Sequence, residues 1–161
     1  MFNIEAIEEQ LADEDGSLRD INIEKLDHQD LEKLVAWYSK NYKVSLALNS
    51  EGEDIKAMIG TENFINKFQN YVIIYATSSV NNILIKDLNF FIIKNVDGSY
   101  AIEMDFKPRK IKFDEFCNFL KQILDCTKKR EYYVKYENVS WKYGDVSEGS
   151  GVIFSCKNVI I

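Results

Sequence analysis

Residues 89–106, NFFIIKNVDGSYAIEMDF, constrain the fold of this chain more than any other segment. Two runs rich in β-branched and aromatic residues flank Asp97-Gly98. An Asp-Gly pair in this setting predicts a β-hairpin, because both residues of a two-residue hairpin turn adopt positive φ angles. The second run alternates as in an antiparallel strand with one buried face. Its apolar positions are Tyr100, Ile102, Met104 and Phe106.

The rest of the chain mixes helical and strand patterns. Apolar residues at helical spacing predict helices over about 3–12, 28–41, 53–68 and 114–127, with Asp27 as the N-cap of the second. β-rich runs predict strands near 18–23, 43–48, 71–76, 131–143 and 151–159. The run 71–76 is apolar on both faces, which favours a central strand. We therefore expect one α+β domain over residues 1–161, with an antiparallel sheet of five or six strands and three or four helices.

The composition indicates a protein of the cytoplasm. The acidic start of the chain is unlike a secretory signal, and no apolar run reaches the roughly 18 residues of a membrane span. Three cysteines, Cys117, Cys126 and Cys156, are too few and too scattered for a disulfide framework. We expect them to be small buried side chains.

The negative charge of the chain is concentrated at its N-terminus. Residues 1–30 hold ten acidic and two basic residues, so they carry a net charge of −8, whereas the remaining 131 residues carry +2. The segment 1–16 would repel nucleic acid and attract a basic partner, although a solvated terminus has the same composition. The basic groups 107–112 and 128–130 bracket a predicted helix, about 20 Å apart, so they do not form one nucleic-acid site.

No segment has a complete catalytic or cofactor motif. Gly144 and Gly149 have the spacing of a phosphate loop, but Ser150 and Gly151 stand where lysine and a hydroxyl are needed, and a strand follows in place of a helix. We interpret this segment as a hairpin loop. His28 is the only histidine, which argues against a zinc site and against a nucleophile–histidine pair.

Carboxylates offer weaker candidates for chemistry. Asp13, Asp15 and Ser17 resemble a compressed calcium loop, and Glu103 and Asp105 could serve as an acid–base pair only if a cleft brought them together. Solvated positions are the simpler interpretation for both. We expect no enzyme activity, no metal and no cofactor.

Aromatic residues cluster near the C-terminus. The cluster consists of Tyr132, Tyr133, Tyr136, Trp141 and Tyr143. Strand alternation would leave some of these rings exposed, and exposed tyrosine and tryptophan are typical anchors of protein interfaces. The alternative is that they belong to the core and to an edge strand.

The acidic lead EEQLADEDG, the following SLRDINIEKLDHQDLEKLVAWYS and the α+β body resemble the small immunity proteins of bacterial contact-dependent inhibition and polymorphic-toxin systems. This resemblance implies a protein that binds a cognate toxin domain, often a nuclease, and covers its active site. A nuclease site is basic, so acidic loops are the expected contacts. The candidate contact residues are Asp13, Glu14 and Asp15, or Glu51, Glu53 and Asp54.

Two other functions remain open at this stage. One is a structural or regulatory homo-oligomer that pairs through an exposed strand edge near residues 131–143. The other is a small enzyme, which a deep pocket with a perturbed carboxylate would favour.

Overall fold

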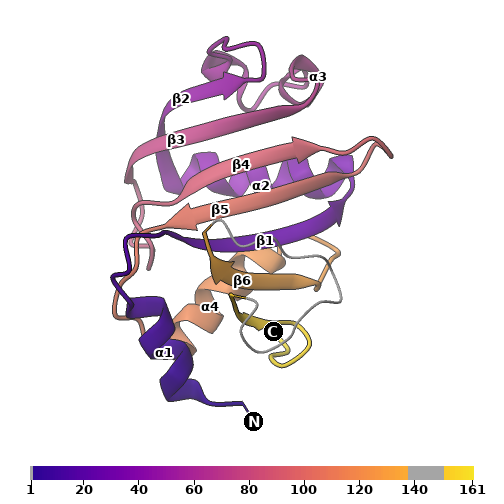
Figure 1. Cartoon of the computed structure of the whole chain (residues 1–161). Helices are drawn as coiled ribbons and strands as arrows, with labels where there is room; N and C mark the ends of the chain where they lie inside the picture. The colour runs from indigo at the N-terminus through magenta and orange to yellow at the C-terminus, as the bar shows by residue number, and fades with distance from the viewer. Residues whose placement is uncertain (1, 138–150) are drawn as a thin grey trace.

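The computed structural model describes residues 2–137 and 151–161 and shows an antiparallel sheet with helices (Figure 1). In these residues the sheet has seven strands in the order β2-β3-β4-β5-β1-β6-β7. The strands are β1 Arg19–Leu26, β2 Tyr42–Asn49, β3 Tyr71–Ser79, β4 Asn89–Lys94, β5 Tyr100–Phe106, β6 Tyr132–Tyr136 and β7 Val152–Ser155. The helices are α1 Ile4–Ala12, α2 His28–Asn41, α3 Phe64–Lys67 and α4 Phe113–Leu124, with a short 3₁₀ helix, η1, at Lys56–Met58. The α+β class is confirmed, with one strand more than expected.

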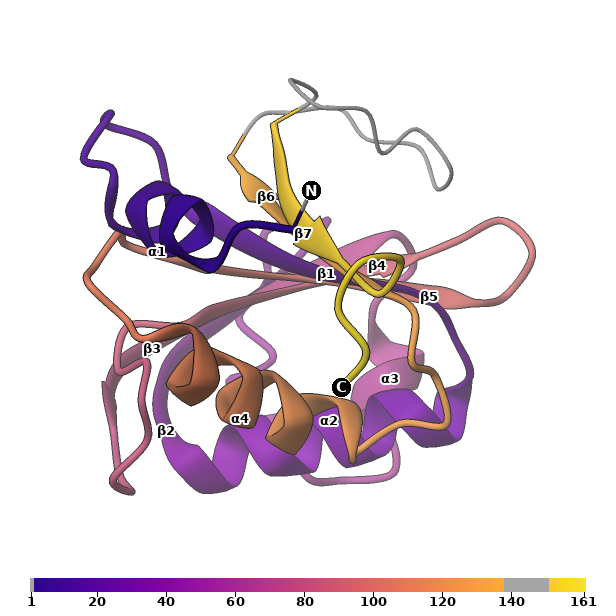
Figure 2. The same cartoon turned by 90° about the horizontal axis from the view of Figure 1, so that it is seen from below.

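The core lies between one face of the sheet and the helices α2 and α4, which run side by side (Figure 2). The predicted apolar face of β5 is buried, with Met104 fully inaccessible to solvent. Phe106 of β5 contacts Phe116 of α4, with ring centres 5.7 Å apart, and Trp37 of α2 contacts Phe119 at 6.1 Å. The two helices therefore pack on the sheet and on each other.

Helix α2 begins where the sequence predicts. Asp27 accepts a hydrogen bond from the amide of Asp30 at 2.7 Å, and the Asp30 carboxylate accepts one from the amide of Asp27 at 3.4 Å. This reciprocal capping box satisfies amides that the first helical turn leaves without partners. Leu31, Leu34 and Tyr38 form its buried stripe.

The predicted hairpin is formed by β4 and β5, but its turn differs from the expected one. The amide of Gly98 donates to the carbonyl of Asn95 at 3.1 Å, and the amide of Asn95 donates to the carbonyl of Ser99 at 2.8 Å. Gly98 has φ +85°, whereas Asp97 has an ordinary negative φ. The connection is thus a three-residue loop with one left-handed residue, which glycine adopts without steric cost.

The helix predicted over 53–68 is wrong. Only η1 and the four-residue α3 form there, and Gly60 between them has φ +86°. Asp54 accepts hydrogen bonds from the amides of Ala47 and Lys56, at 3.1 and 3.0 Å, which fixes a turn where a helix would have to begin. Side chains of Asp and Asn compete with helix formation in this way.

The strand predicted near 18–23 is formed and is the inner strand β1, which pairs with β5 and β6. Two other strands occupy positions in the sheet that differ from the expected ones. The run 71–76 belongs to β3, beside the edge strand β2, and only one of its faces is buried. β6 is not an edge, because β7 pairs along it, so the edge expected near 131–143 is absent for the described residues 132–136.

Helix α4 receives its N-terminal cap from a distant segment. The Glu8 carboxylate of α1 accepts a hydrogen bond from the amide of Phe113 at 2.8 Å and lies 3.3 Å from the ammonium of Lys112. This amide hydrogen bond, more than the nearby ammonium, lowers the pKa of Glu8. A carboxylate at a helix N-terminus also interacts favourably with the positive end of the helix dipole. α1 is thereby attached to the body of the domain.

Candidate partner-binding surfaces

The first predicted cluster, Asp13, Glu14 and Asp15, lies in the exposed loop between α1 and β1. Asp15 accepts hydrogen bonds from the amide and hydroxyl of Ser17, at 3.0 and 2.8 Å, and these bonds lower its pKa. A hydrogen bond between the side chains of Asp13 and Tyr136 adds to the effect of burial in raising the tyrosine pKa. Glu14 lies between them and is exposed. The loop is therefore fixed at two of its three acidic residues.

The side chain of Arg19 fixes this loop by hydrogen bonds to its backbone. Its side chain is fully buried, and it donates hydrogen bonds to the carbonyls of Gln10 at 2.9 Å, Ser17 at 3.2 Å and Leu18 at 3.1 Å. It also donates to the carbonyl of Asp13 and lies 3.3 Å from the carboxylate of Asp15. The cation bound by this acidic loop is thus an arginine of the same chain. The sequence alone does not predict that Arg19 binds this loop, because Arg19 is simply a polar residue in a short predicted strand.

The acidic loop continues onto α1. Glu5, Glu9 and Asp13 follow one another at intervals of four residues, so they share one side of the helix. A hollow of about 460 Å³ lies between this side and the start of α4. Its lining is Glu5, Glu8, Glu9, Ala12, Lys110, Ile111, Lys112 and Glu115. We call the exposed residues Glu5, Glu9, Asp13, Glu14 and Asp15 the N-terminal acidic surface.

The second predicted cluster, Glu51, Glu53 and Asp54, is also exposed, but it has internal roles. Glu53 accepts a hydrogen bond from the side-chain amide of Asn49 at 3.1 Å. Hydrogen bonds from the amides of Lys56 and Ala47 lower the pKa of Asp54. These carboxylates hold the loop after β2 against that strand.

The structure does not bring the two clusters together. β1 and β2 run in the same direction, because three antiparallel strands separate them in the sheet. The first cluster precedes β1 and the second follows β2, so they lie at opposite ends of the sheet (Figure 1). A partner's active site that is covered by one cluster would not reach the other.

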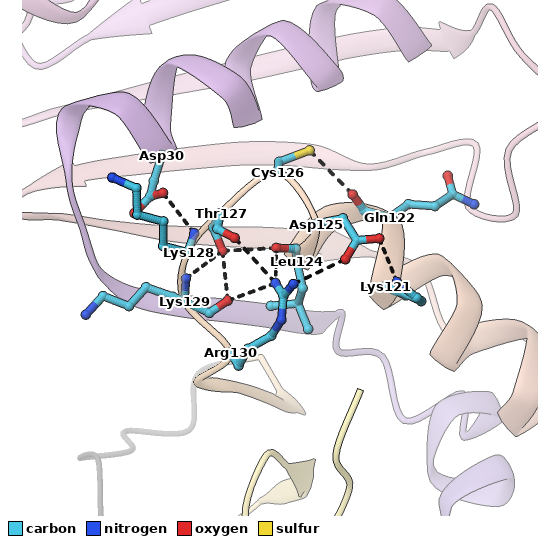
Figure 3. Close-up of polar contacts among 10 residues, drawn as sticks. All are labelled: Asp30, Lys121, Gln122, Leu124, Asp125, Cys126, Thr127, Lys128, Lys129 and Arg130. Carbon is cyan, nitrogen blue, oxygen red and sulfur yellow. Dashed lines mark hydrogen bonds and ion pairs between the residues drawn. The ribbon is translucent and has the colours of Figure 1, made fainter.

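The basic group 128–130 forms part of the turn after α4 (Figure 3). Arg130 donates to the carbonyl of Leu124 and lies 3.3 Å from the carboxylate of Asp125. The amide of Lys128 donates to the buried Asp30 at 3.0 Å, and its ammonium lies 3.3 Å from Asp27. Arg130 thus provides a donor for a carbonyl group at the end of α4, and Lys128 connects this turn to the start of α2.

A third surface, which the sequence analysis missed, is the face of the sheet opposite α2 and α4. At its centre Lys135 lies 2.9 Å from the carboxylate of Asp20 and 3.8 Å from that of Glu103, and Asp105 is opposite Asp20 in the strand register. Burial raises the pKa of Asp20 to about 6, and it raises the pKa values of Glu103 and Asp105. Sequence could suggest the pair Glu103 and Asp105, but only sheet pairing adds Asp20 and Lys135.

Aromatic exposure also differs from the expectation. Tyr132 and Tyr133 are buried, at 2% and 6% exposure, and Tyr136 is half-buried beneath Arg19. Trp141 and Tyr143 lie outside the described residues, as do Gly144, Gly149 and Ser150 of the glycine-spaced segment. Among the described residues, the exposed phenylalanine and tyrosine rings are instead Phe2 near the N-terminus and Tyr71 and Tyr75 on β3.

Other candidate groups have ordinary roles. His28 is exposed at the start of α2 and lies 3.1 Å from Glu32. The three cysteines are free and half-buried. Among the described residues, no three His, Cys, Asp or Glu side chains are grouped so that they could hold a metal ion. None of the described helices is long and apolar enough to span a membrane.

Comparison with known proteins gives one informative likeness. No protein-family model and no curated protein sequence match the chain. A chain in the crystal structure of the toxic C-terminal tip of CdiA from Pseudomonas aeruginosa in complex with its immune protein has a similar fold, with a TM-score of 0.59. The identity is 14%, and the match covers 89% of this chain and 96% of that chain. The likeness shows that the two chains share a fold.

Proposed function

We propose that this chain is an immunity protein that binds a cognate bacterial toxin domain and blocks its activity without catalysing a reaction itself. The observation that carries the proposal is the likeness in fold, over almost the whole of both chains, to a chain of a CdiA toxin–immune protein complex. The resemblance of the acidic lead, the segment 17–39 and the α+β body to small immunity proteins supports the same class.

The N-terminal acidic surface is the proposed contact with the toxin. Its residues are exposed, and the fixed guanidinium of Arg19 keeps the loop in one conformation, so little entropy is lost on binding. The proposed partner is basic at its active site, as a nuclease is, because opposite charges increase the rate of encounter. The loop at Glu51, Glu53 and Asp54 is the less favoured contact, because it offers three exposed carboxylates, whereas the N-terminal acidic surface offers five.

The experiment pairs the chain with the toxic C-terminal domain of a large secreted protein encoded beside its gene. We expect that domain alone to arrest growth of a bacterial host and co-expression of this chain to restore growth, with a stoichiometric complex on size-exclusion chromatography. Absence of both restored growth and a complex contradicts the proposal.

Neutralising three acidic residues tests whether the N-terminal acidic surface contacts the toxin. Glu5→Gln, Glu9→Gln and Glu14→Gln together remove charge while leaving the bonds of Asp13 and Asp15 intact. We expect association at low salt to slow by about tenfold, with a weaker dependence on salt. Glu51→Gln with Glu53→Gln is the matched control, and equal slowing by that pair would move the contact to the second cluster.

The homo-oligomer remains an untested alternative, but its expected edge at β6 is occupied by β7. The enzyme alternative has one feature in its favour, a cavity of about 620 Å³ that is lined in part by Asp105, Asn89 and Thr77. We assign this cavity to binding, on the argument that follows.

A further inference from the structure

The face of the sheet opposite α2 and α4 has two zones, and it faces the viewer in Figure 1. One is apolar and half-buried or exposed, and it consists of Tyr71, Ile73, Tyr75, Phe91 and Ile93. The other carries carboxylates. Phe91 of β4 is directly opposite Glu103 of β5, so the two zones meet side by side. We call this surface the open sheet face.

The carboxylate zone has more negative than positive charge. The Lys135 ammonium lies near Asp20 and Glu103, and Asp105 is opposite Asp20 in the strand register. The carboxylate of Glu137, just after β6, accepts a hydrogen bond from the amide of Leu18 at 3.0 Å. The charges of Asp105 and Glu137 also contribute to the raised pKa of Glu103. One ammonium cannot compensate three partly desolvated carboxylates.

Several polar atoms of this zone are buried without a partner. They are Oδ1 of Asp20, Nδ2 of Asn22 and Oδ1 of Asp105. Asp20 and Asn22 are 1% and 5% exposed, and strand alternation places both on the open sheet face. Buried polar atoms without hydrogen bonds are costly and rare in folded proteins, so these atoms leave hydrogen-bonding capacity in the zone that the described chain does not use.

We propose that the open sheet face is a second contact with the toxin, and that its carboxylate zone receives an arginine or lysine side chain of the toxin. A guanidinium offers five donors and binds carboxylates bidentately, which suits Glu103 and the unpaired oxygen of Asp105. Its aliphatic stem, or a neighbouring apolar residue, would lie on Phe91 and the exposed rings of β3. This inference rests on the proposed function for the identity of the partner.

The carboxylate zone favours a cation more strongly than the neighbouring cavity does. Asp105 also lines the cavity of about 620 Å³ at the end of β3 and β5, but Lys86 and Lys107 line that cavity too. The cavity therefore carries both signs of charge, whereas the zone around Glu103 has a clear excess of carboxylates. The cavity gives the end of a long side chain room beside Asp105.

The first test needs no toxin. N-acetyl-arginine amide is titrated into the isotopically labelled full chain, with N-acetyl-citrulline amide as the uncharged control. We expect saturable amide shifts at residues 20, 103 and 105 with arginine, at roughly millimolar affinity, and none with citrulline. Equal effects of both compounds, or shifts confined to the N-terminal acidic surface, overturn the proposal.

Variants show whether the residues that bind the arginine compound also bind the toxin. Glu103→Gln with Asp105→Asn should abolish the arginine shifts and weaken the toxin complex by at least about tenfold. Glu5→Gln with Glu9→Gln is the control that leaves the arginine shifts unchanged. A toxin complex that forms with unchanged affinity after the change at 103 and 105 overturns this inference and leaves the proposed function intact. If the wild-type chain binds no toxin, the proposed function fails, and the arginine titration still decides whether the open sheet face binds a cation.

Discussion

The guanidinium of Arg19 lies 4.0 Å from the centre of the Tyr136 ring, and the two residues are opposite each other in the register of β1 and β6. The arginine is therefore held between an aromatic face and the carbonyls of the loop that carries the N-terminal acidic surface. A cation over a tyrosine face is attracted by the ring, and more strongly when it is removed from water.

Replacing Arg19 should both destabilise the domain and release the acidic loop. Arg19→Ala leaves several carbonyls without donors, so we expect a loss of about 3 kcal/mol or more in the free energy of unfolding. Urea denaturation measures the loss, and amide exchange of residues 13–17 should accelerate. Lys40→Ala, at an exposed position of α2, should change stability by less than about 0.5 kcal/mol. A stable variant with a protected loop would show that Arg19 does not hold it.

The buried pair of Asp20 and Lys135 should be strongly coupled. At about pH 8, where Asp20 is ionised, Asp20→Ala leaves the Lys135 ammonium with Glu103 at 3.8 Å as its remaining ion-pair partner, so we expect a loss of about 3 kcal/mol. Adding Lys135→Met to Asp20→Ala should restore much of this loss, because neither charge is then left alone. A double-mutant cycle by chemical denaturation measures the coupling, and additive losses would contradict it.

Stability should increase as the pH falls from about 7.5 to about 5.5. Burial raises the pKa of Asp20 to about 6 and raises those of Glu103 and Asp105, so these groups bind protons more tightly in the folded chain than in the unfolded one. The stability they contribute is complete below their unfolded pKa values, about 4. It is lost as the pH rises through their raised pKa values, which for Asp20 is about 6. Urea denaturation at both pH values measures the difference.

Glu103→Gln with Asp105→Asn should reduce this pH dependence and raise stability at about pH 7.5. Below about pH 4 the trend reverses, because hydrogen bonds lower the pKa values of groups such as Asp15, Asp54 and Asp125. The stability from those groups is lost as they are protonated. A pH profile that is unchanged in the variant would show that the carboxylate zone does not govern it.

The hydroxyl groups of Tyr38 and Tyr42 should each contribute to stability. The rings stack with centres 4.8 Å apart, and the hydroxyls donate to the carbonyls of Leu88 at 2.5 Å and Ile85 at 2.6 Å. Tyr38→Phe leaves a buried carbonyl without a donor, so we expect a loss of about 1–3 kcal/mol. Thermal unfolding measures it, with the exposed Tyr75→Phe as a control that should have little effect.

Local signals in the sequence predicted the elements that local chemistry determines. The capping residue Asp27 and the hairpin glycine Gly98 lie where expected, because caps and turns depend on a few adjacent residues. The helix over 53–68 was wrong because the side chain of Asp54 bonds to amides that include one in a neighbouring strand. Apolar spacing does not reveal that competition.

The open sheet face could not be predicted, since it depends on pairing between distant strands. Asp20 and Lys135 are 115 residues apart in sequence and meet only because β1 lies between β5 and β6. The exposure of Asp13, Glu14 and Asp15 was predictable from their composition, but the buried arginine beneath them was not. A partner-binding role for any of these residues stays a prediction.

The turn after β2 has a further consequence for self-association. Along the outer edge of that strand, Ala47 donates to the Asp54 side chain and accepts from Ile55, and the amide of Asn49 donates to the carbonyl of Glu53. Exposed strand edges recruit other strands and lead to aggregation. Here the chain itself occupies hydrogen-bonding groups that an added strand would need along the second half of β2. A strand that pairs along this half of the edge, in a fibril or a swapped dimer, therefore requires the loop to detach first.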